Sequence, residues 1–67
     1  MLNIYVNAHP YQIALNSNLD EVIQLAGFAD QVVAVAVNGE FIPKSTYSET
    51  SVSDKDNIDV VKPIGGG

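Results

Sequence analysis

The segment Gln31-Val32-Val33-Ala34-Val35-Ala36-Val37-Asn38, followed by Gly39-Glu40-Phe41-Ile42-Pro43, decides the fold of this chain. A Val-rich segment that is apolar on both faces is typical of a strand inside a sheet, so we expect residues 31–38 at the sheet centre. Asn-Gly is favoured in tight type I′ turns. We therefore predict a hairpin in which residues 40–42 return antiparallel and stop at Pro43.

The first 15 residues alternate apolar and polar side chains, which is the period of half-buried strands. Each half contributes one apolar face: Leu2, Ile4 and Val6, then Tyr11, Ile13 and Leu15. Residues 7–10 lie between them and combine Asn7, which tolerates left-handed backbone, with Pro10, which keeps His9 out of the helical region. We predict a hairpin with His9 exposed at its tip.

Short-helix signals follow the hairpin. Asn16, Ser17 and Asn18 are candidate N-caps, and Asp20 and Glu21 would place negative charge in the first turn. An apolar stripe recurs at helical spacing: Leu19, Val22, Ile23 and Ala26. Gly27 is suited to end the helix after about two turns, with Phe28 folding back beneath it. We expect the stripe to pack across the sheet.

The remainder of the chain predicts mostly irregular structure and one last strand. Residues 44–51 lack an apolar period, so we expect irregular structure with one turn of helix near Tyr47, after which Val52 re-enters the core. Residues 54–57 (Asp-Lys-Asp-Asn) predict a polar surface turn. They do not predict a calcium-binding EF-hand loop, because such a loop needs about twelve residues with a central Gly. Residues 58–61 form the last strand. The element order predicts an α+β fold, a small mixed sheet with one helix across it.

Composition excludes several classes of function. The 67 residues allow one domain with a small core, and the chain has no Cys and one His, His9. It therefore offers no zinc thiolate site and no histidine pair for a metal, and we predict no catalytic residues, no metal site and no enzyme activity of its own. The net charge of −5 argues against nucleic-acid binding. No segment approaches the ~20 apolar residues that span a membrane, and we expect a cytoplasmic protein without a secretory signal.

The sequence ends in Lys62-Pro63-Ile64-Gly65-Gly66-Gly67. Three glycines cannot bury side chains and have the largest backbone entropy, so a packed fold gains nothing from them. We therefore divide the chain into a folded domain, 1–62, and a flexible Gly-rich tail, 63–67. A frayed terminus or a linker remnant is the alternative interpretation. The C-terminal carboxylate of Gly67 is the candidate reactive group in a chain without a thiol or a phosphate-binding loop.

The element order and the ending together resemble the ubiquitin-like β-grasp fold, and in detail the ThiS family of sulfur carriers in thiamine biosynthesis. The resemblance runs essentially end to end. It is carried by residues 4–7 (Ile-Tyr-Val-Asn), 35–44 (Val-Ala-Val-Asn-Gly-Glu-Phe-Ile-Pro-Lys), 54–61 (Asp-Lys-Asp-Asn-Ile-Asp-Val-Val) and 65–67. Lys55 stands where such carriers often have Gly, which leaves the type of that turn open.

The resemblance implies a function for the tail. A ThiF-like adenylyltransferase would adenylate the Gly67 carboxylate with ATP and a metal ion of its own, so this chain would bind no cofactor. A sulfur donor such as a cysteine desulfurase would then supply the sulfur of a thiocarboxylate, which passes to thiazole synthase. Ile64, Gly65 and Gly66 would thread the partner's active-site channel. The alternatives are a molybdopterin synthase small subunit, a ubiquitin-like protein modifier, and a binding module with an incidental Gly-rich end.

Overall fold

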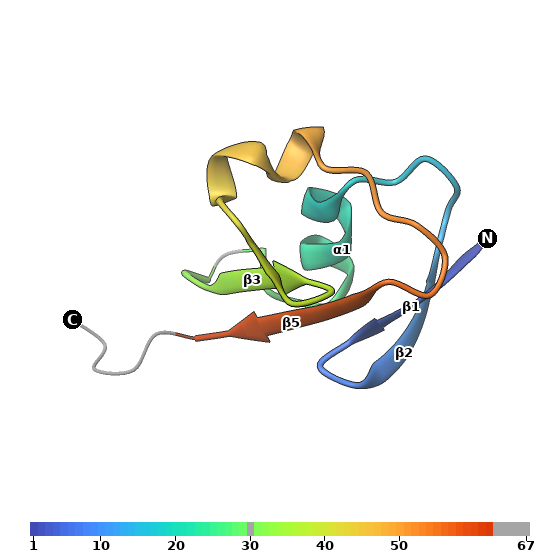
Figure 1. The fold of residues 1–67 in the computed structure, drawn as a ribbon, viewed down its shortest axis with the longest axis horizontal. Coiled ribbons are helices and arrows are strands. Elements are labelled where there is room, and N and C mark those ends of the chain that lie inside the picture. Colours follow the sequence, from blue (N-terminus) through green and yellow to red (C-terminus); the bar gives the residue numbers. More distant parts are fainter. Residues whose placement is uncertain (30, 63–67) are drawn as a thin grey trace.

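The computed structural model describes residues 1–29 and 31–62 of the chain (Figure 1). Within them, the elements follow in this order: β1 (Leu2–Val6), β2 (His9–Ile13), α1 (Leu19–Leu25), β3 (Ala34–Val37), β4 (Glu40–Ile42), the 3-10 helix η1 (Lys44–Glu49) and β5 (Asn57–Val61). The strands form one sheet in the order β2-β1-β5-β3-β4. β1 and β5 are parallel, and the other neighbours are antiparallel. The predicted α+β class with a mixed sheet is confirmed.

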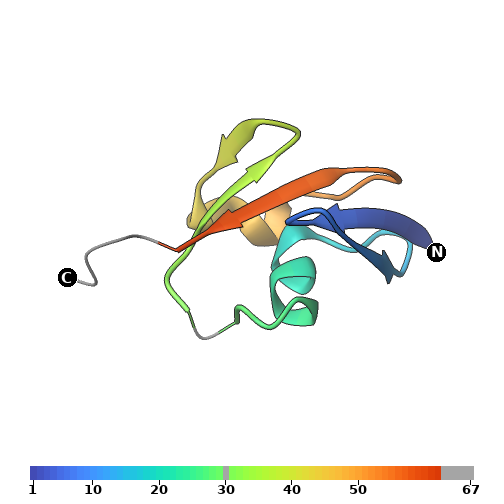
Figure 2. The same ribbon diagram turned by 90° about the horizontal axis from the view of Figure 1, so that it is seen from below.

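One face of the sheet is covered by α1, with η1 beside the helix (Figures 1 and 2). Between helix and sheet lies a single cluster of buried side chains: Ile4, Val6, Ile13, Leu19, Val22, Ile23, Val35, Tyr47, Val52, Ile58 and Val60. The predicted helical stripe therefore faces this core, with Ala26 partly buried against it. The opposite face of the sheet is not covered by α1 or η1, so the described part of the chain has a two-layer arrangement.

Local signals fix both ends of α1. Asn18 is the N-cap: its side chain accepts from the Glu21 N–H at 2.9 Å, and the Glu21 carboxylate accepts from the Asn18 N–H at 3.2 Å. At the other end Gly27 has a left-handed φ of 89°. The N–H of Phe28 then donates to the Ile23 carbonyl at 2.9 Å, which closes the helix as a Schellman motif. The predicted start, length and end of the helix are confirmed.

Both hairpins turn on two residues with left-handed backbone. Asn38 and Gly39 have φ of 51° and 85°, as the predicted type I′ turn requires. The first hairpin turns one step earlier than predicted, at Asn7 and Ala8, with φ of 51° and 68°. The prediction that His9 lies at the tip is therefore wrong, since His9 begins β2. Pro10 is tolerated within β2 because that strand is an edge of the sheet.

Two further strand predictions need correction. The Val-rich strand begins only at Ala34, and Val32 before it is 78% exposed. β3 is an interior strand, but the central position belongs to β5. In the first hairpin β2 ends at Ile13, so Leu15 does not continue its buried face and is 64% exposed.

The segment between β4 and β5 is more regular than predicted: the 3-10 helix η1 has six residues, about two turns in place of the one expected near Tyr47. η1 carries Tyr47 into the core, and Val52 is buried after it. The polar turn follows at residues 54–55, with Lys55 in the left-handed region at φ 67°. Asp54 accepts from the Asn3 N–H at 2.7 Å, and Asp56 accepts from the Ser53 N–H at 2.7 Å. The Asp56 carboxylate thus closes the turn, the Asp54 carboxylate joins the turn to β1, and Lys55 adopts the left-handed conformation that Gly favours.

Candidate functional site

The predicted site residues Ile64, Gly65, Gly66 and Gly67 lie outside the described part of the chain, as does Pro63. The structure therefore defines the segment from which they continue. We call residues 60–62 the tail base: Val60 and Val61 end β5, and Lys62 follows. Because β5 is the central strand of the sheet, the tail base is held from two sides.

On one side, β3 pairs with the end of β5. Ala34 lies opposite Val61, and Val35 lies opposite Val60. The Val60 side chain is buried with Val35 in the core, so this pairing is supported by packing as well as by the ladder. Antiparallel pairing thus continues to the last residue of β5.

On the other side, Asn7 takes over where β1 ends. The Asn7 N–H donates to the Ile58 carbonyl at 2.9 Å, and the Asn7 side-chain oxygen accepts from the Val60 N–H at 2.8 Å. This second bond is partly buried and joins residues that are 53 positions apart. A turn side chain therefore satisfies a strand N–H that no backbone carbonyl of β1 reaches. The sequence around Asn7 indicates only a turn, and no neighbouring residue indicates that its side chain bonds Val60.

The face of the sheet opposite α1 carries exposed apolar side chains beside the tail base. Side chains alternate across a sheet, so the neighbours of buried Val35 and Val60 point to this outer face. Phe41 lies opposite Ala36, and Ala34 lies opposite Val61. Phe41 and Val61 are 64% and 60% exposed. We call Ala34, Ala36, Phe41 and Val61 the outer-face patch. The sequence pattern does not indicate this patch, because the exposure of each apolar residue depends on the pairing of the strands.

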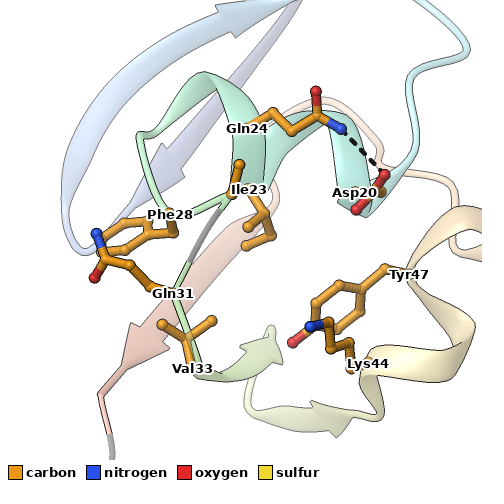
Figure 3. Close-up of a pocket in the computed structure, with 9 residues that line it drawn as sticks. Asp20, Ile23, Gln24, Phe28, Gln31, Val33, Lys44 and Tyr47 are labelled. Carbon is orange, nitrogen blue, oxygen red and sulfur yellow. Dashed lines mark hydrogen bonds between the residues drawn. The ribbon is translucent and has the colours of Figure 1, made fainter.

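A small cavity of about 70 Å³ lies on the other side of the molecule, between α1 and η1 (Figure 3). Ile23, Phe28, Val33 and Tyr47 contribute its apolar wall. At the rim, the Gln24 amide donates to the Asp20 carboxylate at 3.2 Å. Burial raises the pKa of the Tyr47 phenol above its usual value, so Tyr47 is a neutral packing residue at physiological pH.

Among residues 1–29 and 31–62, no group of three or more His, Cys, Asp or Glu side chains could hold a metal ion. His9 is exposed in β2. No helix in this described part of the chain is long and apolar enough to cross a membrane.

Comparison with known proteins identifies the family. The model of the ThiS family matches residues 4–67. The chain belongs to the ThiS family. This match includes all the segments that carry the resemblance: residues 4–7, 35–44, 54–61 and 65–67.

A solved structure confirms the fold at the family level. The crystal structure of the thiamine biosynthesis protein ThiS from Geobacter metallireducens superposes with a TM-score of 0.83 at 29% identity, covering 98% of this chain and 100% of that one. A solution structure of a thiamine biosynthesis protein from the same organism gives 0.75 at 29% identity, covering 98% and 88%. The predicted ubiquitin-like β-grasp fold of a ThiS protein is thereby confirmed.

Curated relatives place the same domain within longer chains. A thiazole synthase from Magnetococcus marinus is 32% identical over 66 residues, which is 98% of this chain and 20% of the relative. This chain thus spans about a fifth of that protein's length. The uncharacterized protein ycf40 of Porphyra purpurea is 21% identical over 66 residues and is covered to 93%. ThiS-like sequence therefore occurs both inside thiazole synthases and in chains of about this length.

Proposed function

We propose that this chain is the sulfur carrier for thiazole formation in thiamine biosynthesis. The observation that carries the proposal is the ThiS family match over residues 4–67, which includes the terminal glycines. The relatives that combine a similar region with thiazole synthase in one polypeptide support the thiamine pathway over molybdopterin synthesis. In this function the chain is a co-substrate of its partners and performs no catalysis itself.

The chemistry requires activation of the Gly67 carboxylate. A terminal carboxyl group has a pKa of about 3.3–3.7, so at neutral pH it is an anion that repels nucleophiles. Attack of one carboxylate oxygen on the α-phosphorus of ATP forms an acyl adenylate and releases pyrophosphate. A sulfur nucleophile then attacks the acyl carbon, and AMP leaves. When the nucleophile is a persulfide, the product is an acyl disulfide. A second thiol then attacks its S–S bond, which releases the thiocarboxylate and leaves a disulfide, and the thiocarboxylate sulfur can be passed to thiazole synthase.

The partners follow from these steps. A ThiF-like adenylyltransferase would supply the ATP site and its metal ion, and a donor such as a cysteine desulfurase would supply the sulfur. Thiazole synthase would receive it. We propose the cytoplasm as the compartment for all of these reactions.

In this proposal the tail enters the active site of the partner and the folded domain docks on the partner's surface. We assign residues 1–62 to the folded domain and 63–67 to the tail. Gly65 and Gly66 lack a Cβ, so they can pass close to the backbone of a narrow channel. Four residues from Ile64 reach about 13–14 Å when extended, which is enough for a recessed site. The folded domain would stay outside, docked on the adenylyltransferase through the outer-face patch, because Val61 belongs both to that patch and to the tail base.

Mass spectrometry of the intact chain tests the proposal directly. After incubation with a ThiF-like enzyme, ATP and a sulfur source, we expect the mass change of one oxygen replaced by sulfur, located on the peptide that ends at Gly67. Rescue of a thiamine requirement in cells is the expected genetic result. Absence of the thiocarboxylate under conditions that modify another ThiS protein would overturn the proposal, and isopeptide adducts on cellular lysines would favour a modifier instead.

A further inference from the structure

The turn between β3 and β4 contains the pair of residues most susceptible to spontaneous chemical change. When the backbone nitrogen of the residue after an Asn attacks the side-chain amide carbon, ammonia leaves and a cyclic imide forms. Water then opens the imide to Asp or to isoaspartate. Gly at the second position favours the attack because it has no Cβ to block the approach. Asn38 and Gly39 are both exposed, and no atom of a residue beyond the two chain neighbours of Gly39 lies within 4 Å of the position of a Cβ added to it.

The structure holds the Asn38 side chain away from this reaction. Its amide nitrogen donates to the Asp56 carboxylate at 3.0 Å, and its amide oxygen accepts from the Asn57 N–H at 2.9 Å. The Asn38 N–H also donates to the Asn57 carbonyl at 2.7 Å. The side chain thus reaches across to the start of β5, and these contacts must open before the amide carbon can turn toward the Gly39 nitrogen.

We propose that Asn38-Gly39 is a deamidation site whose rate is controlled by the bond from Asn38 to Asp56. Reaction would require a local opening of the contacts between the β3-β4 turn and residues 56–57. The observed rate is then the intrinsic rate multiplied by the fraction of molecules that are open. A bond to a carboxylate is among the stronger side-chain hydrogen bonds, which makes Asp56 the larger determinant of that fraction.

The product would weaken the contact that protected the Asn. Conversion to Asp replaces the donor that faces Asp56 with a second carboxylate, and like charges at this spacing repel. Conversion to isoaspartate adds a backbone carbon to a two-residue turn whose register is fixed by the pairing of Val37 with Glu40. Either product is expected to unfold more easily, so the turn would mark aged molecules.

Variants of the full chain test the proposal, with the conversion measured by peptide mapping that separates Asp from isoaspartate. We expect slower conversion at Asn38 in native buffer than in urea. Asp56→Ala should raise the native rate roughly tenfold, the factor that corresponds to one charge-assisted hydrogen bond. Asp54→Ala is the matched control, since it removes a carboxylate from the same turn that bonds the Asn3 N–H and not Asn38. It should leave the rate close to that of the natural chain.

Two outcomes would overturn the proposal: equal rates in native buffer and urea, or equal acceleration by Asp54→Ala and Asp56→Ala at matched unfolding stability. Two further variants, in which the carboxylate and the amide exchange places, test the same bond even if Asp56→Ala does not fold. The Asn38→Asp variant should have a lower unfolding midpoint, and adding Asp56→Asn should restore most of it, because a donor and a carboxylate again face each other. If the second substitution does not restore the midpoint, the bond between Asn38 and Asp56 does not stabilise the turn, and the proposal is likewise overturned.

Discussion

Asn7 holds the N–H of Val60, with 2.8 Å between that nitrogen and the Asn7 side-chain oxygen. The contact occupies the point where β1 has ended and β5 continues toward the tail base. Since Val60 is also buried against β3, this single side chain satisfies the backbone N–H of the last core residue of β5. The path of the chain out of the sheet therefore depends on a turn residue from the N-terminal hairpin.

Replacing Asn7 should destabilise the protein through this bond. Asn7→Gly keeps the left-handed backbone but leaves the partly buried Val60 N–H without its acceptor, so we expect the free energy of unfolding to fall by about 1–3 kcal/mol. Asn7→Asp keeps an acceptor oxygen and should lose much less. Urea unfolding measures both variants. Equal stability of Asn7→Gly and the natural chain would show that water replaces the bond without loss.

The two hairpin turns predict opposite effects of Gly and Ala. Ala8 sits at φ 68° and Gly39 at φ 85°, in equivalent positions of the two hairpins. A residue with a Cβ is strained in this region by about 1–2 kcal/mol, part of which is offset by the greater unfolded-state entropy of Gly. Ala8→Gly should therefore stabilise the protein by up to about 1 kcal/mol. Thermal or urea unfolding is the measurement.

Gly39→Ala is the paired variant for this comparison. It should destabilise the protein by about 1 kcal/mol through φ alone, because no atom lies near the added Cβ. Changes of the same sign in the two turns would contradict backbone strain as the cause.

The predictions that depend on interactions between residues close in the sequence are confirmed. The Asn18 cap, the end of the helix at Gly27 and the Asn38-Gly39 turn each depend on residues a few positions apart. The first turn lies one residue earlier than predicted. Ala8 adopts a left-handed conformation there, which a Gly at that position would have indicated and an Ala does not. Leu15 continues the alternation of Tyr11 and Ile13 in the sequence, but β2 ends at Ile13 because Ile13 pairs with Leu2, the first residue of β1.

The order of the strands depends on long-range pairing, and the prediction that the Val-rich strand is the central one is wrong. A Val-rich strand was expected at the centre because central strands are often buried on both faces. Here the outer face of the sheet is open, so the central strand β5 alternates between exposed and buried residues as an edge strand could. Its position follows from parallel pairing with β1, which joins Val6 to Ile58 across most of the chain. Likewise, the partner of Asn7 could not be read from its neighbours.

Alkaline pH should destabilise the protein through Tyr47. Burial raises the pKa of its phenol, whereas an unfolded Tyr ionises near pH 10. As pH rises past that value, the unfolded state loses its proton first, so the contribution of Tyr47 to stability is complete below pH ~10 and decreases above it. Tyr47→Phe has no proton to lose and should show a smaller decrease in urea midpoint between about pH 9 and pH 11. Tyr5→Phe is the control at an exposed position; equal flattening by both variants would contradict the assignment.

Deletion of Gly66 and Gly67 should separate function from folding. The last buried residue in the described part of the chain is Val60, so we expect the unfolding midpoint of the truncated chain to match that of the full chain. Thiocarboxylate formation, followed by mass spectrometry, should be lost. A clear fall in the midpoint would contradict the proposed division between residues 1–62 and the tail.

The outer-face patch should affect activation of the tail more than it affects folding. Phe41 is 64% exposed on the sheet face that continues into the tail base, so Phe41→Thr should change the free energy of unfolding by no more than about 1 kcal/mol. Because docking would bury this side chain, we expect the KM of the ThiF-like enzyme for the carrier to rise about tenfold or more, with kcat less affected. Leu15→Thr is the matched control, since Leu15 is also 64% exposed but lies outside the strands. Equal effects of the two substitutions on KM would place the docking surface elsewhere.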